Sequence, residues 1–189
     1  MQHHADSSLV PAFIKTKTEL WEHIILQLAS LLDGQRDWVT NLANTSSLVY
    51  HSLLSYPAFG NGPSSVNWCG FYINTSLFPT PKIRMDHSAP SDASSRLLLG
   101  PFCGKPACQF IDITPGKGRG VCADAFMSRR IIVVPDVEAY PGHIACDGDT
   151  RSEIVCPLIL GSSGKEVTLG VFDLDCLAKG GFDDDDRRG

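Results

Sequence analysis

Two apolar runs near the end of the chain decide its fold: Ile154-Val-Cys-Pro-Leu-Ile-Leu160 and Val167-Thr-Leu-Gly-Val-Phe-Asp-Leu174. Both are rich in β-branched and aliphatic residues over the length of a strand, so they predict two consecutive β-strands. Shorter runs of the same kind come earlier, at residues 66–73, 97–99, 108–113 and 131–134. The chain therefore carries the strands of a sheet.

Helical segments precede and interrupt these strands. Apolar residues recur near helical spacing in residues 13–32 and 37–54, and the first pattern ends at the turn signal Asp33-Gly34. A short helix is expected at residues 121–127, after the glycine-rich turn at 116–120. That turn has neither Gly-x-Gly-x-x-Gly spacing nor a Gly-Lys-Ser/Thr ending, so a tight turn is favoured over a phosphate-binding loop.

Composition excludes several classes of protein. A chain of 189 residues with 43% hydrophobic content has the size and apolar fraction of one globular domain. Its net charge of −5, without a large cluster of Lys or Arg, argues against a nucleic-acid partner. The amino-terminal residues lack the features of a secretory signal, and no apolar run reaches membrane-spanning length. We therefore expect a cytoplasmic protein with no membrane partner.

Two polar segments lie outside the predicted helices and strands. Residues 74–96 are rich in Pro, Ser and Asp without sustained periodicity, which is typical of a solvated hairpin loop. Residues 180–189 contain four consecutive aspartates followed by two arginines, and a charge run at a terminus predicts a solvated end.

The chain has seven cysteines, a large number for the reducing cytoplasm: Cys69, Cys103, Cys108, Cys122, Cys146, Cys156 and Cys176. The odd number leaves at least one unpaired. Structural zinc sites need close pairs of ligands, and the sequence has no Cys-x-x-Cys, so no metal is expected. The remaining interpretation is a mixture of buried structural thiols and a few reactive ones.

One thiol stands close in sequence to an imidazole and carboxylates, in Tyr140-Pro-Gly-His-Ile-Ala-Cys-Asp147 followed by Glu153. Asp173 and Asp175 follow on a predicted strand, where alternation places both side chains on one face. A thiolate is the reactive form of cysteine, and paired carboxylates either transfer a proton or hold an ammonium group. The pattern indicates cysteine redox chemistry on a small cationic substrate.

Six ordered motifs together resemble one known family: Asn67-Trp-Cys-Gly-Phe-Tyr72, Leu99-Gly-Pro-Phe-Cys-Gly-Lys-Pro-Ala-Cys108, Gly118-Arg-Gly-Val-Cys122, Gly142-His-Ile-Ala-Cys-Asp147, Ser152-Glu-Ile-Val-Cys-Pro157 and Gly170-Val-Phe-Asp-Leu-Asp175. The chain is similar to the free methionine-(R)-sulfoxide reductases. The resemblance implies an α+β GAF fold, with a six-stranded antiparallel sheet and helices packed against it. It also implies a single domain over residues 1–189 with a core at about 20–186 and mobile ends, and reduction of the free amino acid rather than the residue in a protein.

The resemblance assigns roles to three cysteines. Cys146 matches the nucleophile that attacks the sulfoxide sulfur and becomes a sulfenic acid, and Cys108 matches the resolving thiol that forms a disulfide. Cys122 stands at an expected helix start, where amide dipoles favour a thiolate that would assist recycling, with a small buried hydrophobe as the equal alternative. Cys103 is an alternative disulfide partner of Cys108 if that loop moves. For His143 we expect an orienting role rather than a Cys-His dyad.

The other implied site residues surround the substrate. Glu153 and Asp175 are expected near the sulfoxide oxygen, with Asp173 completing a carboxylate pair that binds the ammonium group and supplies an acid. Trp68 and Tyr72 match an aromatic wall around the methylthio group, and the backbone at Ile144 and Ala145 is expected to bind the substrate carboxylate.

The resemblance implies no bound cofactor, and it implies thioredoxin, with NADPH-dependent thioredoxin reductase, as the external reductant. A homodimer is a further expectation. The chain ends soon after residue 186, where the resemblance leads us to expect a further helix that contributes to dimer packing or to domain stability. The alternatives are a non-catalytic GAF sensor of a small molecule or of redox state, because one fold hosts many functions, and a peroxidase-type thiol enzyme.

Overall fold

The computed structural model describes residues 9–60, 62–78, 95–116, 120–144, 146–161 and 164–189, which form an α+β domain. Its centre is a six-stranded antiparallel sheet with strand order β3-β2-β1-β6-β5-β4. The strands are β1 (Val66–Asn74), β2 (Arg96–Gly104), β3 (Phe110–Asp112), β4 (Ile132–Val134), β5 (Ser152–Leu160) and β6 (Val167–Cys176). The predicted α+β class and six-stranded sheet are therefore confirmed.

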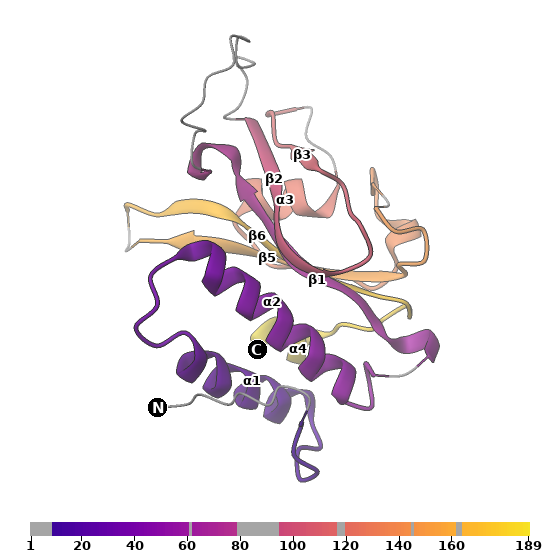
Figure 1. The fold of residues 1–189 in the computed structure, drawn as a ribbon. Coiled ribbons are helices and arrows are strands. Elements are labelled where there is room, and N and C mark those ends of the chain that lie inside the picture. The colour runs from indigo at the N-terminus through magenta and orange to yellow at the C-terminus, as the bar shows by residue number, and fades with distance from the viewer. Residues whose placement is uncertain (1–8, 61, 79–94, 117–119, 145, 162–163) are drawn as a thin grey trace.

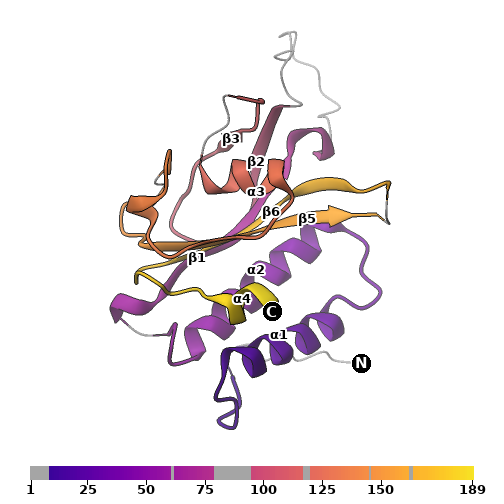
Figure 2. The same cartoon turned by 180° about the vertical axis from the view of Figure 1, so that it is seen from behind.

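The helices lie on both faces of the sheet (Figure 1). They are α1 (Lys17–Leu31), α2 (Trp38–Ser55), α3 (Val121–Ser128) and α4 (Asp184–Arg188). Helices α1, α2 and α4 occupy one side, and α3 covers the other side, as the reverse view also shows (Figure 2). None of the helices in the described residues is long and apolar enough to cross a membrane.

Local sequence explains where the first two helices begin. Thr16 forms a capping box with Glu19, because its side chain accepts from the Glu19 amide while the Glu19 carboxylate accepts from the Thr16 amide. Asp37 caps α2 by accepting from the Thr40 amide at 2.9 Å. Each helix then buries one apolar face, with Leu20 and Leu53 fully buried, and burial of such a side chain stabilises the fold by about 1.5–3 kcal/mol.

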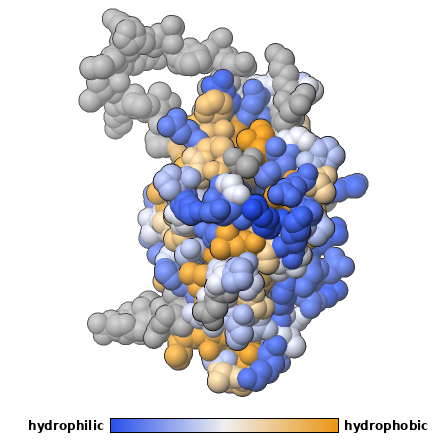
Figure 3. All heavy atoms as spheres, turned by 90° about the vertical axis from the view of Figure 1, so that its right-hand side faces the viewer, coloured by the Kyte–Doolittle hydropathy of each residue, from blue (hydrophilic) through white to orange (hydrophobic). Residues whose placement is uncertain are grey.

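Strand alternation divides the interior into two apolar clusters. On the α1 and α2 side, Leu174 packs with residues of those helices. On the α3 side, Trp68, Tyr72 and Val155 pack with Cys122 of α3. On the side of the molecule in Figure 3, apolar residues lie in small groups among hydrophilic ones. Because different helices cover the two faces of the sheet, polar side chains can line the α3 face without being buried in the larger apolar cluster on the other face.

Strand β2 is longer than its sequence predicts. The apolar run at 97–99 is followed by Gly100 and Pro101, which are poor strand residues, yet the ladder with β1 continues to Gly104. The register shifts between Gly70 and Tyr72, opposite this Gly-Pro pair. A bulge there lets the strand tolerate a residue that lacks an amide hydrogen. Of the polar segment 74–96, residues 79–94 lie outside the described residues, so the predicted loop stays a prediction there.

The prediction of a solvated carboxyl-terminal end is wrong for Phe182 and Asp186, although Asp183, Asp184, Arg187 and Arg188 are exposed. Phe182 is 2% exposed and packs against Phe59, and residues 184–188 form the short helix α4. The Asp186 carboxylate is buried, lies 2.6 Å from Lys17 Nζ and accepts a hydrogen bond from Trp21 Nε1 at 3.0 Å. Composition predicts solvation of an aspartate run, but an ion pair and an indole donor from α1 compensate the burial of this carboxylate.

Candidate active site

A cavity of about 220 Å³ lies on the α3 side of the sheet. Residues of β1, β3, β5 and β6, the start of α3, the loop before β3 and the loop before β5 surround it. The polar side chains that line it are Asp112, Cys122, His143, Asp147, Thr150, Glu153, Asp173 and Asp175, together with Cys108 and Cys146. No Lys or Arg is among the described residues that line this cavity. Its field therefore favours a cationic ligand.

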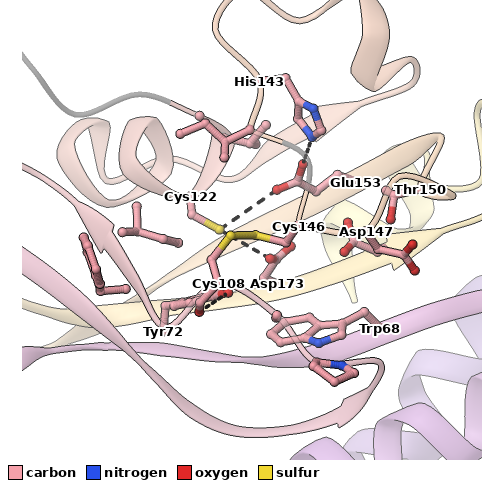
Figure 4. A pocket seen from close by; sticks show the side chains of 18 of the residues that line it. Trp68, Tyr72, Cys108, Cys122, His143, Cys146, Asp147, Thr150, Glu153 and Asp173 are labelled. Carbon is pink, nitrogen blue, oxygen red and sulfur yellow. Dashed lines mark hydrogen bonds and ion pairs between the residues drawn. A yellow bond between two sulfur atoms is a disulfide. The ribbon is translucent and has the colours of Figure 1, made fainter.

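A disulfide joins Cys108 and Cys146 at the cavity, with their Cα atoms 5.6 Å apart (Figure 4). The two residues are 38 positions apart in sequence and come from different loops. Tyr72 helps to place the first loop, because its hydroxyl donates to the Cys108 carbonyl oxygen at 3.0 Å. Cys146 is exposed and Cys108 is partly exposed, so the disulfide is accessible to an external thiol.

Cys122 lies beside this disulfide as a free, buried thiol (Figure 4). It is the second residue of α3, and its thiol donates to Asp173 Oδ2 at 3.3 Å and lies 4.0 Å from Glu153 Oε1. Burial, followed by the charge of Asp173, raises the pKa of this thiol well above its usual value. The expectation that the helix start favours a thiolate is therefore wrong for this state, because desolvation and two carboxylates outweigh the amide dipoles.

The three carboxylates predicted at the site come from two neighbouring strands. Glu153 of β5 is directly opposite Asp175 of β6, and Asp173 faces the same cavity one strand repeat away. Burial and the nearby charge of Glu153 raise the pKa values of Asp173 and Asp175 well above the usual range. Asp173 is 6% exposed, and its Oδ1 has no hydrogen-bond partner. Such groups retain a proton at a pH where ordinary carboxyls are ionised.

His143 takes part in this cluster, which sequence reasoning did not predict. Its Nε2 lies 3.3 Å from Glu153 Oε2, on the oxygen that does not face Cys122 (Figure 4). The spacing of His143 to Cys146 suggested a partner for the thiol. The structure instead places the imidazole against a carboxylate, and the orienting role stays a prediction.

Asn67 is a second residue that the sequence reasoning missed. Its side-chain amide donates to Asp147 Oδ2 at 3.1 Å and to Thr150 Oγ1 at 3.0 Å. Both partners line the cavity, so Asn67 ties the 146–150 loop to β1. Asn67 is the first residue of the motif at 67–72, one of the six on which the family resemblance rests. Its place in that motif is the feature of the sequence that could have identified it as a site residue.

Aromatic rings form one wall of the cavity. Trp68 stacks on Tyr72 with ring centroids 5.8 Å apart and on Phe102 at 5.5 Å. Both Trp68 and Tyr72 are buried and line the cavity. Trp68 Nε1 is buried without a hydrogen-bond partner. The wall is apolar with one donor, which suits a ligand that carries both a thioether-like group and an oxygen.

The structure brings most of the predicted site residues around this one cavity. They are Trp68, Tyr72, Cys108, Cys122, Ile144, Cys146, Glu153, Asp173 and Asp175. Ala145 lies outside the described residues. Cys103, the alternative disulfide partner, is a free thiol on β2 and does not line the cavity.

The antiparallel sheet with α3 over the cavity defines a GAF domain. A solved GAF-domain structure matches with a TM-score of 0.76 and 40% identity, over 100% of this chain and 89% of that one. The chain is also 42% identical over 185 residues to the free methionine-R-sulfoxide reductase of Saccharomyces cerevisiae, with 98% of this chain and 87% of that protein covered. The protein belongs to the free methionine-R-sulfoxide reductase family.

A solved structure of free methionine-R-sulfoxide reductase from Neisseria meningitidis, in complex with its substrate, is similar along nearly the whole chain. Its identity is 32% and its TM-score 0.70, over 96% of this chain and 87% of that one. No family model matches the chain.

Proposed function

We propose that this protein reduces free L-methionine-(R)-sulfoxide to L-methionine by a cysteine mechanism. The observation that carries the proposal is the Cys108–Cys146 disulfide at a small cavity whose only described charged groups are carboxylates and one histidine. Family membership supports the substrate, because the relatives from yeast and Neisseria carry the name of this activity.

The reaction begins with Cys146 as the nucleophile. Its thiolate attacks the sulfoxide sulfur, a carboxyl group gives a proton to the oxygen, and methionine leaves while the oxygen stays on Cys146 as a sulfenic acid. The Cys108 thiol then attacks this sulfur, which yields the disulfide and one water. The short Cα separation of 5.6 Å supports this second step, because it lies within the range of disulfide geometry.

The acid is supplied by the carboxylate cluster. Asp173 and Asp175 have raised pKa values because of burial and Glu153, so the cluster retains a proton for the sulfoxide oxygen near neutral pH. Glu153 and Asp175 lie opposite each other and act at the oxygen. Asp173 binds the substrate ammonium.

The enclosed shape favours the free amino acid. Trp68 and Tyr72 contact the methylthio group, and the backbone at Ile144 binds the substrate carboxylate. A sulfoxide within a peptide has no free ammonium group at the same distance, so it loses the pairing with the cluster. This loss discriminates against protein substrates.

The disulfide is returned to two thiols by an external dithiol, which we propose to be thioredoxin, itself reduced by thioredoxin reductase and NADPH. The exposure of Cys146 supports this step, because exchange begins with attack on an accessible sulfur. No bound cofactor enters the reaction. The cytoplasmic location and the homodimer stay predictions from the sequence.

The test is NADPH oxidation coupled through thioredoxin and its reductase. The expected result is turnover of the free R epimer, with little turnover of the S epimer or of a peptide-bound sulfoxide. Cys146→Ser should abolish turnover, and Cys103→Ser, which alters a thiol away from the cavity, should retain it. If reduced protein turns over none of these substrates, the proposal fails and a GAF sensor becomes the better hypothesis.

A further inference from the structure

The cavity also gathers metal-ligand side chains around Cys122, a free thiol to which the proposed reaction gives no role. Cys122 Sγ, a Glu153 carboxylate oxygen and an Asp173 carboxylate oxygen all lie within 4.8 Å of one another. All three residues are buried. We propose that the disulfide form of this protein binds one thiophilic divalent cation of the zinc class at Cys122, Glu153 and Asp173.

The distances fit zinc coordination. Zinc binds thiolate sulfur at about 2.3 Å and carboxylate oxygen at about 2.0–2.2 Å, so a sulfur and an oxygen of one tetrahedral site lie about 3.5 Å apart. Cys122 Sγ lies 3.3 Å from Asp173 Oδ2 and 4.0 Å from Glu153 Oε1. An ion can therefore contact all three groups after small side-chain movements.

The second oxygen of the Asp173 carboxylate is unpaired, whereas Oδ2 accepts from the Cys122 thiol. Asp173 Oδ1 is buried and has no hydrogen-bond partner, although the carboxyl group faces the cavity. A buried polar atom without a partner is rare in folded proteins. In the absence of substrate, a cation bound through this carboxylate would contact the unpaired oxygen in place of the substrate ammonium and would balance the negative charge of the cluster.

His143 supports the site from outside. It contacts Glu153 Oε2, while Glu153 Oε1 faces Cys122, so the imidazole orients the carboxylate without occupying the oxygen that faces the ion. Outer contacts of this kind are typical of metal ligands. The fourth coordination position faces the cavity and is available to water.

The thiolate selects the metal. Mg²⁺ and Ca²⁺ prefer oxygen ligands alone, whereas one sulfur with carboxylates and a nearby imidazole suits Zn²⁺ or Co²⁺. Binding replaces the thiol proton with the metal and releases that proton to solvent, without any change of oxidation state. In the disulfide form Cys122 is the only free thiol among the described residues that line the cavity, so the other two site cysteines do not compete.

Co²⁺ alone serves as the probe, added to oxidised protein without reductant after the disulfide has been verified by mass. We expect saturation at one equivalent, with a near-ultraviolet charge-transfer band from thiolate to cobalt and displacement by Zn²⁺ but not by Mg²⁺. Cys122→Ser should abolish the band, and Asp173→Asn should weaken Co²⁺ binding by about tenfold or more.

Matched controls alter the same residue types elsewhere. Cys103→Ser changes a thiol outside the cavity, and Asp149→Asn changes an exposed carboxylate that pairs with Lys105. Both should bind Co²⁺ as the unaltered protein does. Absence of the band, its persistence in Cys122→Ser, or unchanged affinity in a folded Asp173→Asn variant would overturn the proposal.

The metal inference does not rest on the proposed reaction. Binding is read by absorbance on protein that is not turning over, so failure to bind leaves the reductase proposal intact. Failure of turnover likewise leaves the metal site intact.

Discussion

Replacement of Asp173 by asparagine should stabilise the protein at neutral and alkaline pH while it removes a group that the proposed reaction needs. The side chain is 6% exposed, its Oδ1 has no partner, and burial together with Glu153 raises its pKa. Asparagine has nearly the same shape without the charge. The expected gain reflects relief of a buried charge rather than a new contact.

The direction of the stability change with pH follows from proton binding. Because the folded-state pKa of Asp173 is raised, the folded protein binds more protons than the unfolded chain above the unfolded pKa of about 3.9. Stability therefore falls as the pH rises from about 4 through the folded pKa, at up to about 1.4 kcal/mol per pH unit. Asp173→Asn removes this loss, so its advantage should be small near pH 4.5 and about 1–3 kcal/mol at pH 8.

Urea denaturation of the disulfide form at a series of pH values measures this effect. Asp149→Asn, which alters an exposed carboxylate, should stay within about 0.5 kcal/mol of the unaltered protein at each pH. If Asp173→Asn is less stable by the same amount at pH 4.5 and pH 8, the carboxylate is a structural element and the reasoning is refuted. If Asp173→Asn gains stability and loses activity, the wild-type carboxylate serves function at a cost in stability, as residues of active sites often do.

Three further predictions concern other parts of the molecule. Reduction of the Cys108–Cys146 disulfide, which spans 38 positions, should lower the free energy of unfolding by about 4 kcal/mol, and a loss under about 1 kcal/mol in urea denaturation would contradict this. Asp186→Ala should destabilise by about 2–4 kcal/mol in the same assay because Lys17 and Trp21 Nε1 lose a buried partner, whereas Asp185→Ala should have little effect. Glu153→Gln should lower kcat/KM for free methionine-(R)-sulfoxide by about 10²-fold or more, and a value within threefold of the unaltered enzyme would exclude an acid role.

Sequence patterns predict the helices and strands well where local propensity and packing agree. The apolar stripes at 13–32 and 37–54 become α1 and α2, and the two decisive runs become β5 and β6. Strand β2 is underpredicted because Gly100 and Pro101 lower the local propensity, while pairing with β1 carries the strand to Gly104. Pairing is a property of two segments, and a single segment does not reveal it.

The carboxyl-terminal end also depends on contacts with a distant segment, which its own sequence does not reveal. Four aspartates in a row predict solvation from composition. The partners of Asp186 are Lys17 and Trp21, more than 160 positions earlier in the chain. Nothing within the last ten residues indicates that α1 offers a cation and an indole donor at this place.

By itself the sequence determined the order of the elements, the alternation of Asp173 and Asp175 on one strand face, and the motifs that resemble the family. These depend on side-chain periodicity and residue type, which are local properties. Only the tertiary structure decided that the disulfide expected from the resemblance lies beside Cys122, that His143 contacts Glu153, and that Cys122 is buried next to two carboxylates. The physical reason is that proximity and desolvation arise from packing of distant segments, and they set both the reactivity of a thiol and the pKa of a carboxyl group.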